Sequence, residues 1–189
     1  MAKKSAIKDI WDFLWKSDSV WSWLVDLILA FLIVRFIFFP LMSLILSSSL
    51  PFVVVESNSM LHESNFDAFW EKQGAFYKDF NITKETFEEF SFKNGFKKGD
   101  IMVISGKEDY EIGDIIVFRV PVQQKPIIHR IISKNSALNT FETKGDYNAY
   151  QLSYEKSVSK EQVIGKAVGK VPMLGWVKLV FAGIFGLSS

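Results

Sequence analysis

The sequence predicts a mainly β domain on an N-terminal transmembrane helix, with a small helical insert in the β domain. Two observations support this fold class. The stretch from Leu27 to Leu46 is apolar except at three positions, and about 20 helical residues of this kind span the hydrocarbon core of a bilayer. After Leu50, short runs rich in Val, Ile and Phe alternate with clusters of Gly, Asp, Asn and Lys. That alternation is typical of strands separated by turns.

The apolar stretch is interpreted as a retained transmembrane anchor within residues 21–50. It is longer than the roughly 7–15 apolar residues of a cleavable signal sequence, and it lies farther from the N-terminus. Small residues at 47–49 stand where a cleavage site would lie, so removal remains an alternative. A buried helix of a soluble core is a second alternative, although such helices rarely carry Leu, Ile and Phe on every face.

Residues 1–20 are expected to form an amphipathic helix that lies in the membrane interface. Its apolar residues follow the spacing of one helix face: Ile7, Ile10, Trp11, Leu14 and Trp15. Lysines at positions 3, 4, 8 and 16 precede the span. Because positive charge is retained on the cytoplasmic side, we expect a cytoplasmic N-terminus in the cell membrane and the residues after Leu50 on the outer face.

Composition excludes several kinds of chemistry. The 189 residues include 22 Lys and Arg against 21 Asp and Glu, a formal net charge of +1, so no global field attracts nucleic acid. The chain has no Cys, which excludes disulfides, thiolate metal sites and a cysteine nucleophile. Two histidines, His62 and His129, are too few for a three-His zinc site. Hydroxyl nucleophiles and carboxylates remain.

Strands are expected at the short apolar runs that follow the anchor. These runs are 51–55, 101–104, 115–120, 127–132, 140–143 and 163–171. Gly99-Asp100 and Gly113-Asp114 precede two of them, and we interpret both pairs as turn formers. Within the insert, residues 61–98, Thr83 is placed to cap a helix that carries Phe87 and Phe90 on its apolar face, with Ile82 as a hydrophobic staple.

A serine hydrolase is the chemistry that these residues can build. It needs a hydroxyl, a base, a group that orients the base, and donors for the oxyanion. The base would be one of the two histidines or a Lys, with Lys125 and Lys144 as candidates. His62 follows Ser59 by three residues, and His129 lies in an apolar run where a strand would fix its ring. The alternative to a catalytic role is that His129 is a half-buried histidine of a strand whose ring bonds the backbone.

Five motifs behind the membrane helix occur in a diagnostic order. They are Ser57 to Met60, Gly113 to Phe118, Pro126 to Arg130, Thr143 to Asn148 and Val163 to Pro172. In this order they resemble type I signal peptidases, and the His129 motif is similar to the archaeal and endoplasmic-reticulum branch, in which His replaces a Lys base. The likeness covers about residues 51–176 and the anchor.

The resemblance implies a mainly antiparallel β fold and a set of site residues. Ser59 matches the nucleophile and His129 the general base. The Ser59 backbone N–H and the Ser57 hydroxyl match the oxyanion donors, and Met60 matches a residue beside the pocket for the small side chain that precedes the cut. The resemblance implies no metal and no organic cofactor.

The acid of the catalytic triad is where this sequence departs from the family. The family's Asp lies six residues after the Asp of its Lys-Gly-Asp motif, and here that position is Leu152. Three arrangements stay open: Asp146 orients His129, Glu155 takes that role, or Ser and His act as a dyad. We expect Asp146 to be the acid, although it could equally serve only the Gly145-Asp146 turn.

The function that the resemblance implies is endoproteolytic removal of signal peptides from exported preproteins. Residues 51–171 would be the catalytic domain, and the apolar residues 172–189 would associate with the membrane. Partners would be preprotein signal peptides and the lipid bilayer, with the export machinery as a candidate. Two alternatives stay open: a catalytically silent membrane subunit of the same fold, and a serine endopeptidase with a narrow substrate set.

Overall fold

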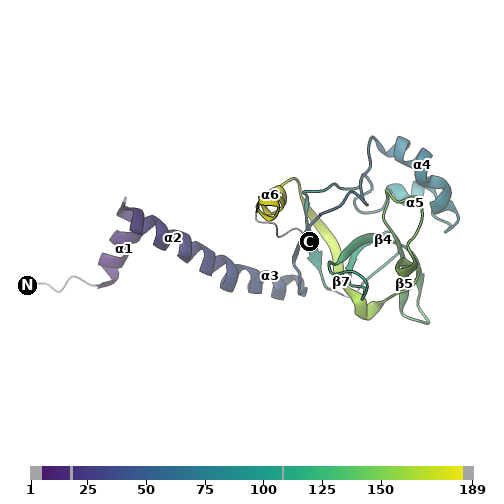
Figure 1. The fold of residues 1–189 in the computed structure, drawn as a ribbon. Helices are drawn as coiled ribbons and strands as arrows, with labels where there is room; N and C mark the ends of the chain where they lie inside the picture. Colours follow the sequence, from purple (N-terminus) through teal and green to yellow (C-terminus); the bar gives the residue numbers. More distant parts are fainter. Residues whose placement is uncertain (1–5, 18, 108, 185–189) are drawn as a thin grey trace, which may run out of the picture. The chain divides into compact units, whose positions relative to one another are not determined.

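The structure is a computed structural model that describes residues 6–17, 19–107 and 109–184. The chain divides into two compact units, residues 1–45 and residues 46–189 (Figure 1). Unit 1 is helical, and unit 2 holds the sheet and every candidate catalytic residue.

Unit 1 consists of consecutive helices. The helix α1 spans Ala6–Lys16, and Ser19 caps α2, Val20–Ile33, by accepting from the Ser22 backbone N–H. A π-helical turn, η1 (Val34–Phe38), leads into α3, Phe39–Leu46. The π turn lies immediately before Pro40, which lacks the N–H that a regular helix needs at that position.

One helix is long and apolar enough to cross a membrane, among the residues that the structure describes. It runs from Val20 to Leu46 without interruption, has a mean hydropathy of 2.5, and buries none of that apolar stretch inside the molecule. A helix of 27 residues whose apolar window is not buried inside the molecule fits a membrane anchor.

Unit 2 is built on a seven-stranded sheet in which every neighbouring pair is antiparallel. The strand order is β1-β2-β7-β3-β4-β5-β6. The strands are β1 (Phe52–Val54), β2 (Ile101–Ser105), β3 (Ile115–Phe118), β4 (Ile127–Asn135), β5 (Thr140–Lys144), β6 (Val158–Ser159) and β7 (Val163–Val171). This confirms the predicted fold class, and only the short β6 was not expected.

The central strand β3 is buried on both faces of the sheet. Ile115 and Val117 belong to one core cluster with Met102 and Ile104, whereas Ile116 and Phe118 face a second cluster with Ile131 and Phe141. Successive side chains of a strand point to opposite faces. The unbroken apolar run at 115–118 therefore reflects a strand with apolar layers on both sides.

The insert forms two helices that pack on the sheet. The helix α4 spans Phe66–Lys78 with Asn65 as its N-cap, and α5 spans Lys84–Glu88 with Thr83 as its N-cap. The expected cap at Thr83 is thereby confirmed, and Ile82 and Phe87 share the core cluster that also contains Ile132 of β4. The insert thus closes one end of the sheet, beside β4 and β5 (Figure 1).

Short elements complete unit 2. The 3-10 turns η2 (Ser153–Glu155) and η3 (Lys160–Gln162) flank β6, and α6 spans Trp176–Ile184 after β7. Gly99 and Gly113 adopt φ values of +92° and +97°, and the Asp that follows each glycine accepts a backbone N–H from three residues earlier. The predicted turn role of Asp100 and Asp114 is confirmed.

Candidate active site

Ser59 lies in a tight turn that follows β1. The Leu61 N–H donates to the Asn58 carbonyl at 3.0 Å, which places Ser59 at the second position of the turn. The side chain of Asn58 anchors this turn to the insert by accepting from the Lys98 N–H at 3.2 Å. Ser59 is half-buried, and its hydroxyl lies 3.2 Å from that of Ser57.

His129 lies on β4 and is buried. Its Nδ1 is 2.5 Å from Glu155 Oε1, and the second oxygen of Glu155 accepts the Leu152 N–H at 2.7 Å. Both side chains are shielded from solvent. In a neutral imidazole whose Nδ1–H donates to a carboxylate, Nε2 is left with its lone pair. This is the tautomer that a general base needs.

Gly145 lies beside both His129 and the backbone of Ser59. A Cβ at this position would lie 2.8 Å from His129 Nε2 and 2.9 Å from the Ser59 carbonyl oxygen. The Tyr147 N–H donates to that same carbonyl at 2.8 Å, and the turn 145–148 is closed by the Asn148 N–H on the Gly145 carbonyl at 2.9 Å. The missing side chain of Gly145 therefore leaves room beside both the His129 ring and the backbone of Ser59.

The Asp146 carboxylate, which the sequence predicts to orient His129, bonds other side chains in the described part of the chain. It accepts from Arg130, from His62 Nε2 at 3.0 Å and from the Tyr77 hydroxyl at 2.7 Å. The cause is strand alternation: Arg130 pairs with Lys144 across β4 and β5. Opposite residues of an antiparallel pair share a face, so the next pair, His129 and Gly145, lies on the other face of the sheet. Asp146, one residue later, lies again on the face of Arg130.

Arg130 is fully buried, and all of its donors are occupied. Its guanidinium donates to both Asp146 oxygens and to the carbonyls of Ser91, Phe92 and Gly113. Burial by itself raises the pKa of Asp146, but the charge of Arg130 and the His62 hydrogen bond outweigh it and hold the pKa well below its usual range. The pair is therefore ionised at neutral pH.

His62, the other imidazole, is enclosed in this second network. Its ring stacks on Phe69 at a centroid distance of 3.6 Å, and a side chain at Gly95 would collide with it. Nε2 is held by Asp146, while Nδ1 is buried with no hydrogen-bond partner within the described part of the chain. His62 therefore faces Asp146 and the insert, and His129 is the histidine directed at the serine turn.

Neither lysine candidate for the base is directed at Ser59. The Lys144 ammonium donates to Gln73 Oε1 and to the carbonyls of Gly145 and Asp146, and it lies over the rings of Phe76 and Tyr77. Burial lowers the pKa of Lys144 to about 8, against the opposing charges of Asp146 and Glu155. Lys125 forms an exposed ion pair with Glu56 at 2.8 Å.

Met60 is fully buried in the core cluster of Val55 and Phe96, and its Sδ accepts the Asp146 N–H at 3.4 Å. Ser57 is exposed beside Ser59. Sequence reasoning overlooked the role of Arg130. The available signal was a charged residue inside the apolar run 127–132, because a charge buried in a strand requires a partner.

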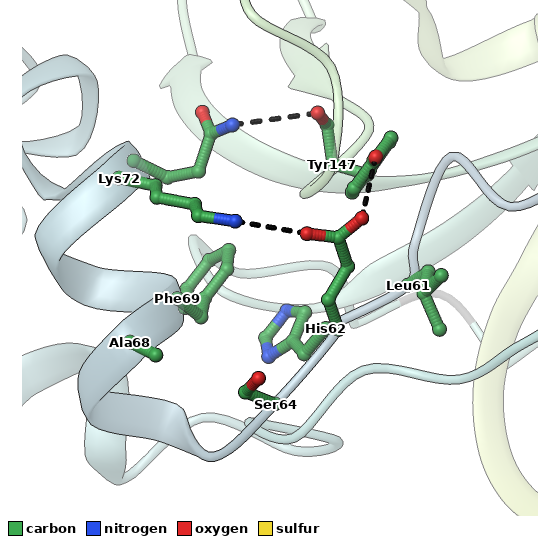
Figure 2. Close-up of a pocket in the computed structure, with 9 residues that line it drawn as sticks. Leu61, His62, Ser64, Ala68, Phe69, Lys72 and Tyr147 are labelled. Carbon is green, nitrogen blue, oxygen red and sulfur yellow. Dashed lines mark hydrogen bonds and ion pairs between the residues drawn. The ribbon is translucent and has the colours of Figure 1, made fainter.

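A small pocket of about 40 Å³ lies between α4 and the turn 145–148 (Figure 2). Glu63 spans it, accepting from Lys72 Nζ and from the Tyr147 hydroxyl, both at 2.8 Å. This volume holds a few water molecules. Over the residues described, no three His, Cys, Asp or Glu side chains gather as a metal site would need.

Comparison with known proteins gives consistent relatives. No model of a known protein family matches the chain. The signal peptidase complex catalytic subunit SEC11 of Lodderomyces elongisporus is 30% identical over 118 residues, which are 52% of this chain and 71% of the relative. The subunit of the same name from Colletotrichum graminicola is 30% identical over 119 residues, 51% and 68% of the two chains. That of Candida tropicalis is 28% identical over 118 residues, 52% and 71%.

We expect Gly145→Ala to inactivate the site without unfolding the protein. The added methyl group would lie 2.7 Å from the Asn148 amide nitrogen, 2.8 Å from His129 Nε2 and 2.9 Å from the Ser59 carbonyl, so these groups must shift. A misplacement of about 1 Å costs about 10²-fold in rate. The measurement is the rate of labelling by a serine-directed phosphonate. Gly183→Ala is the matched control, since a Cβ there meets nothing within 4 Å. Unchanged labelling of Gly145→Ala would contradict this account of the site.

Asp146→Asn should destabilise the protein in a pH-dependent way. Because folding lowers the pKa of Asp146, its carboxylate stabilises the fold above the unfolded-state pKa of about 3.9, and this stabilisation is lost as the pH falls through the folded pKa. Breaking a buried ion pair costs about 3–5 kcal/mol. Urea unfolding should show that loss at pH 7 and a smaller one at pH 3. The exposed Asp109→Asn serves as control, and equal effects of both variants at pH 7 would refute the prediction.

Proposed function

The chain belongs to the family of signal peptidase complex catalytic subunits, and from that premise we propose that it is a membrane-anchored serine endopeptidase that removes signal peptides from exported preproteins. The observation that supports this best is the arrangement around Gly145. A Cβ at Gly145 would lie 2.8 Å from His129 Nε2 and 2.9 Å from the Ser59 carbonyl oxygen, so the ring and the Ser59 turn are neighbours there. Glu155 holds the opposite nitrogen of the same ring.

In the proposed mechanism, Ser59 is the nucleophile and His129 the general base. Nε2 takes the hydroxyl proton as Oγ attacks the scissile carbonyl, and the same nitrogen then gives the proton to the leaving amine. A water molecule, activated in turn by His129, hydrolyses the acyl-enzyme. Every proton passes through one nitrogen, so the ring must keep its Nδ1 proton throughout.

We assign the orienting acid to Glu155 instead of Asp146. Glu155 is fully buried, and its two oxygens have separate tasks, one on His129 Nδ1 and one on the Leu152 N–H. The second contact fixes the side chain within the η2 turn. The 3-10 turn brings residue 155 back beside residue 152, so Glu155 reaches the ring although the family's Asp position is Leu152.

The oxyanion would be stabilised by the Ser59 backbone N–H and the Ser57 hydroxyl. The Ser57 hydroxyl lies 3.2 Å from Ser59 Oγ, which is close enough to reach an oxygen on the carbon that Oγ attacks. Preorganised donors of this kind contribute about 2.7–4 kcal/mol each to transition-state stabilisation. Met60, buried under the turn, would form the floor on which the residue preceding the cut rests.

The anchor accounts for the class of substrate. A signal peptide carries an apolar segment that lies in the bilayer, so an enzyme held at the same surface meets its cleavage site at high effective concentration. We propose that unit 2 lies on the outer face with the N-terminus cytoplasmic, as the lysines ahead of the span indicate. The relatives are named as subunits of a complex, and companion subunits are proposed for this chain as well.

Ser59→Ala and His129→Ala should each abolish cleavage of a preprotein, and the double variant should be little worse than either single one. A nucleophile and its base act as a unit, so their effects do not add. Purified full-length protein in detergent or vesicles is assayed on one preprotein, and the product N-terminus is sequenced. Ser64→Ala, an exposed serine on the same segment, is the control. Cleavage by Ser59→Ala above background would exclude the assignment.

Glu155→Gln should lower turnover by about 10³–10⁴-fold while the protein stays folded, because an amide no longer enforces the Nδ1–H tautomer. The exposed Glu161→Gln is the matched control and should behave like the parent. Asp146→Asn, after correction for its folded fraction, should lose much less activity than Glu155→Gln. The reverse order of the two losses would return the acid to Asp146.

A further inference from the structure

The small pocket beside α4 has walls from two parts of unit 2 (Figure 2). One wall continues the turn that carries Ser59. It contains Leu61, two residues beyond Ser59, and Tyr147, whose N–H donates to the Ser59 carbonyl at 2.8 Å. The other wall belongs to the insert and contains Ala68 and Phe69 of α4. The insert and the nucleophile turn therefore border this space together.

Hydrogen bonds hold the two walls in place. The Tyr147 carbonyl accepts from Gln73 Nε2 at 3.3 Å, and the Tyr147 hydroxyl donates to Glu63 at 2.8 Å. Lys72 of α4 donates to the second oxygen of Glu63, also at 2.8 Å. Gln73 is fixed in turn, because its Oε1 accepts from Lys144 Nζ at 3.2 Å. The shape of the pocket is thus set by specific contacts between the insert and the turn 145–148.

The direction of proton transfer puts this pocket on the leaving-group side of the scissile bond. In the proposed mechanism His129 Nε2 gives its proton to the leaving amine, so the first residue after the cut must lie against that nitrogen. The backbone of Gly145 lies beside Nε2, since a Cβ there would be 2.8 Å away. Tyr147 follows two residues later, and two extended substrate residues cover about 7 Å. A substrate chain that leaves Nε2 over Gly145 therefore reaches Tyr147 within its first two residues.

We propose that this pocket receives the side chain of one of the first two residues that follow the cut, and that it selects small, uncharged side chains there. The subsite rests on the proposed function, because it is defined by the bond that Ser59 and His129 cleave. It lies on the other side of that bond from the residue that Met60 would support. None of the five family motifs lies in the insert, residues 61–98, and the subsite gives this segment a part in choosing the substrate.

The size of the pocket favours a small side chain. Its volume is about 40 Å³, and one water molecule needs roughly 10–15 Å³ of such space. A methyl, hydroxymethyl or isopropyl group displaces a few water molecules and fits, whereas an indole ring does not. The apolar part of the wall, formed by Leu61, Ala68 and Phe69, suits contact with a methyl group.

The polar groups around the pocket already have partners. Glu63 accepts from Lys72 and from the Tyr147 hydroxyl. Gln73 uses both ends of its amide, one on Tyr147 and one on Lys144. A charged substrate side chain would have to displace one of these partners or stay unpaired in the pocket, and either is costly. An uncharged side chain leaves all of these contacts intact.

The test varies the substrate at both positions after the cut. Full-length protein in vesicles is assayed on preproteins with Gly, Ala, Asp or Trp at the first or at the second position, and the product N-terminus is sequenced. At the position that the pocket serves, we expect kcat/KM for Ala to exceed that for Gly by about fourfold, which corresponds to one buried CH₂ group. It should exceed that for Asp and for Trp by more than about tenfold.

Two variants should shift this preference in opposite directions. Ala68→Leu fills the pocket and should abolish the advantage of Ala over Gly. Leu61→Ala enlarges the pocket and should raise kcat/KM for Trp relative to Ala by about tenfold. A general loss of structure would lower all rates together and leave their ratios unchanged. Ala75→Leu is the matched control and should keep the parental rates, because Ala75 is an exposed alanine of α4 outside the pocket lining.

The outcomes separate the subsite from the proposed function. Cleavage by the parent with equal kcat/KM for the four residues at both positions, or with a preference for Asp or Trp over Ala, would refute the subsite alone. Parental ratios in both Ala68→Leu and Leu61→Ala would do the same. A parent that cleaves none of the preproteins would refute the proposed function, and the subsite would fall with it.

Discussion

The burial of one guanidinium organises the site and the insert around it. Arg130 has five N–H donors and no contact with solvent, and a buried charge is tolerated only when every donor has a partner. Its acceptors come from three places in the chain: Asp146 after β5, Gly113 before β3, and the segment that contains Ser91 and Phe92. Phe87 and Phe90 cover its plane. The insert is thus held by the residue next to His129, the proposed general base.

This arrangement divides the polar residues of the site between two faces of one strand. His129 and its hydrogen-bond partner Glu155 lie on one face, and Arg130 with Asp146 lies on the other. The two networks approach each other at the turn 145–148, whose backbone holds the Ser59 carbonyl. The Glu155 network therefore holds the ring of His129, the proposed base. The Arg130 network holds the turn 145–148, which contacts the Ser59 carbonyl. Asp146 and Glu155 therefore cannot replace each other, because they lie on opposite faces of the strand.

The segment that leads to Ser59 is held by contacts from distant parts of unit 2. The Gly99 N–H donates to the Val55 carbonyl at 2.9 Å, and the Gly99 carbonyl accepts the Gly175 N–H at 2.8 Å, next to α6. Glu56, three residues before Ser59, bonds Lys178 of α6 at 3.0 Å. The turn that carries the proposed nucleophile therefore depends on the β1 segment, the Gly99 turn and α6 together.

The sequence by itself determined the apolar helix, six of the seven strands, the turn roles of Asp100 and Asp114, and the cap at Thr83, since each depends on neighbours within a few residues. Ser59 and His129 are predicted from ordered motifs, and a turn is the alternative role that the sequence gives Gly145-Asp146. The partner of His129 was decided only by tertiary structure. Asp146 and Glu155 are both plausible in sequence, and the choice between them depends on strand register, which places Asp146 on the face of Arg130. A local sequence pattern does not encode that register, because it is set by the pairing of β4 with β5, two strands that are separate in the sequence.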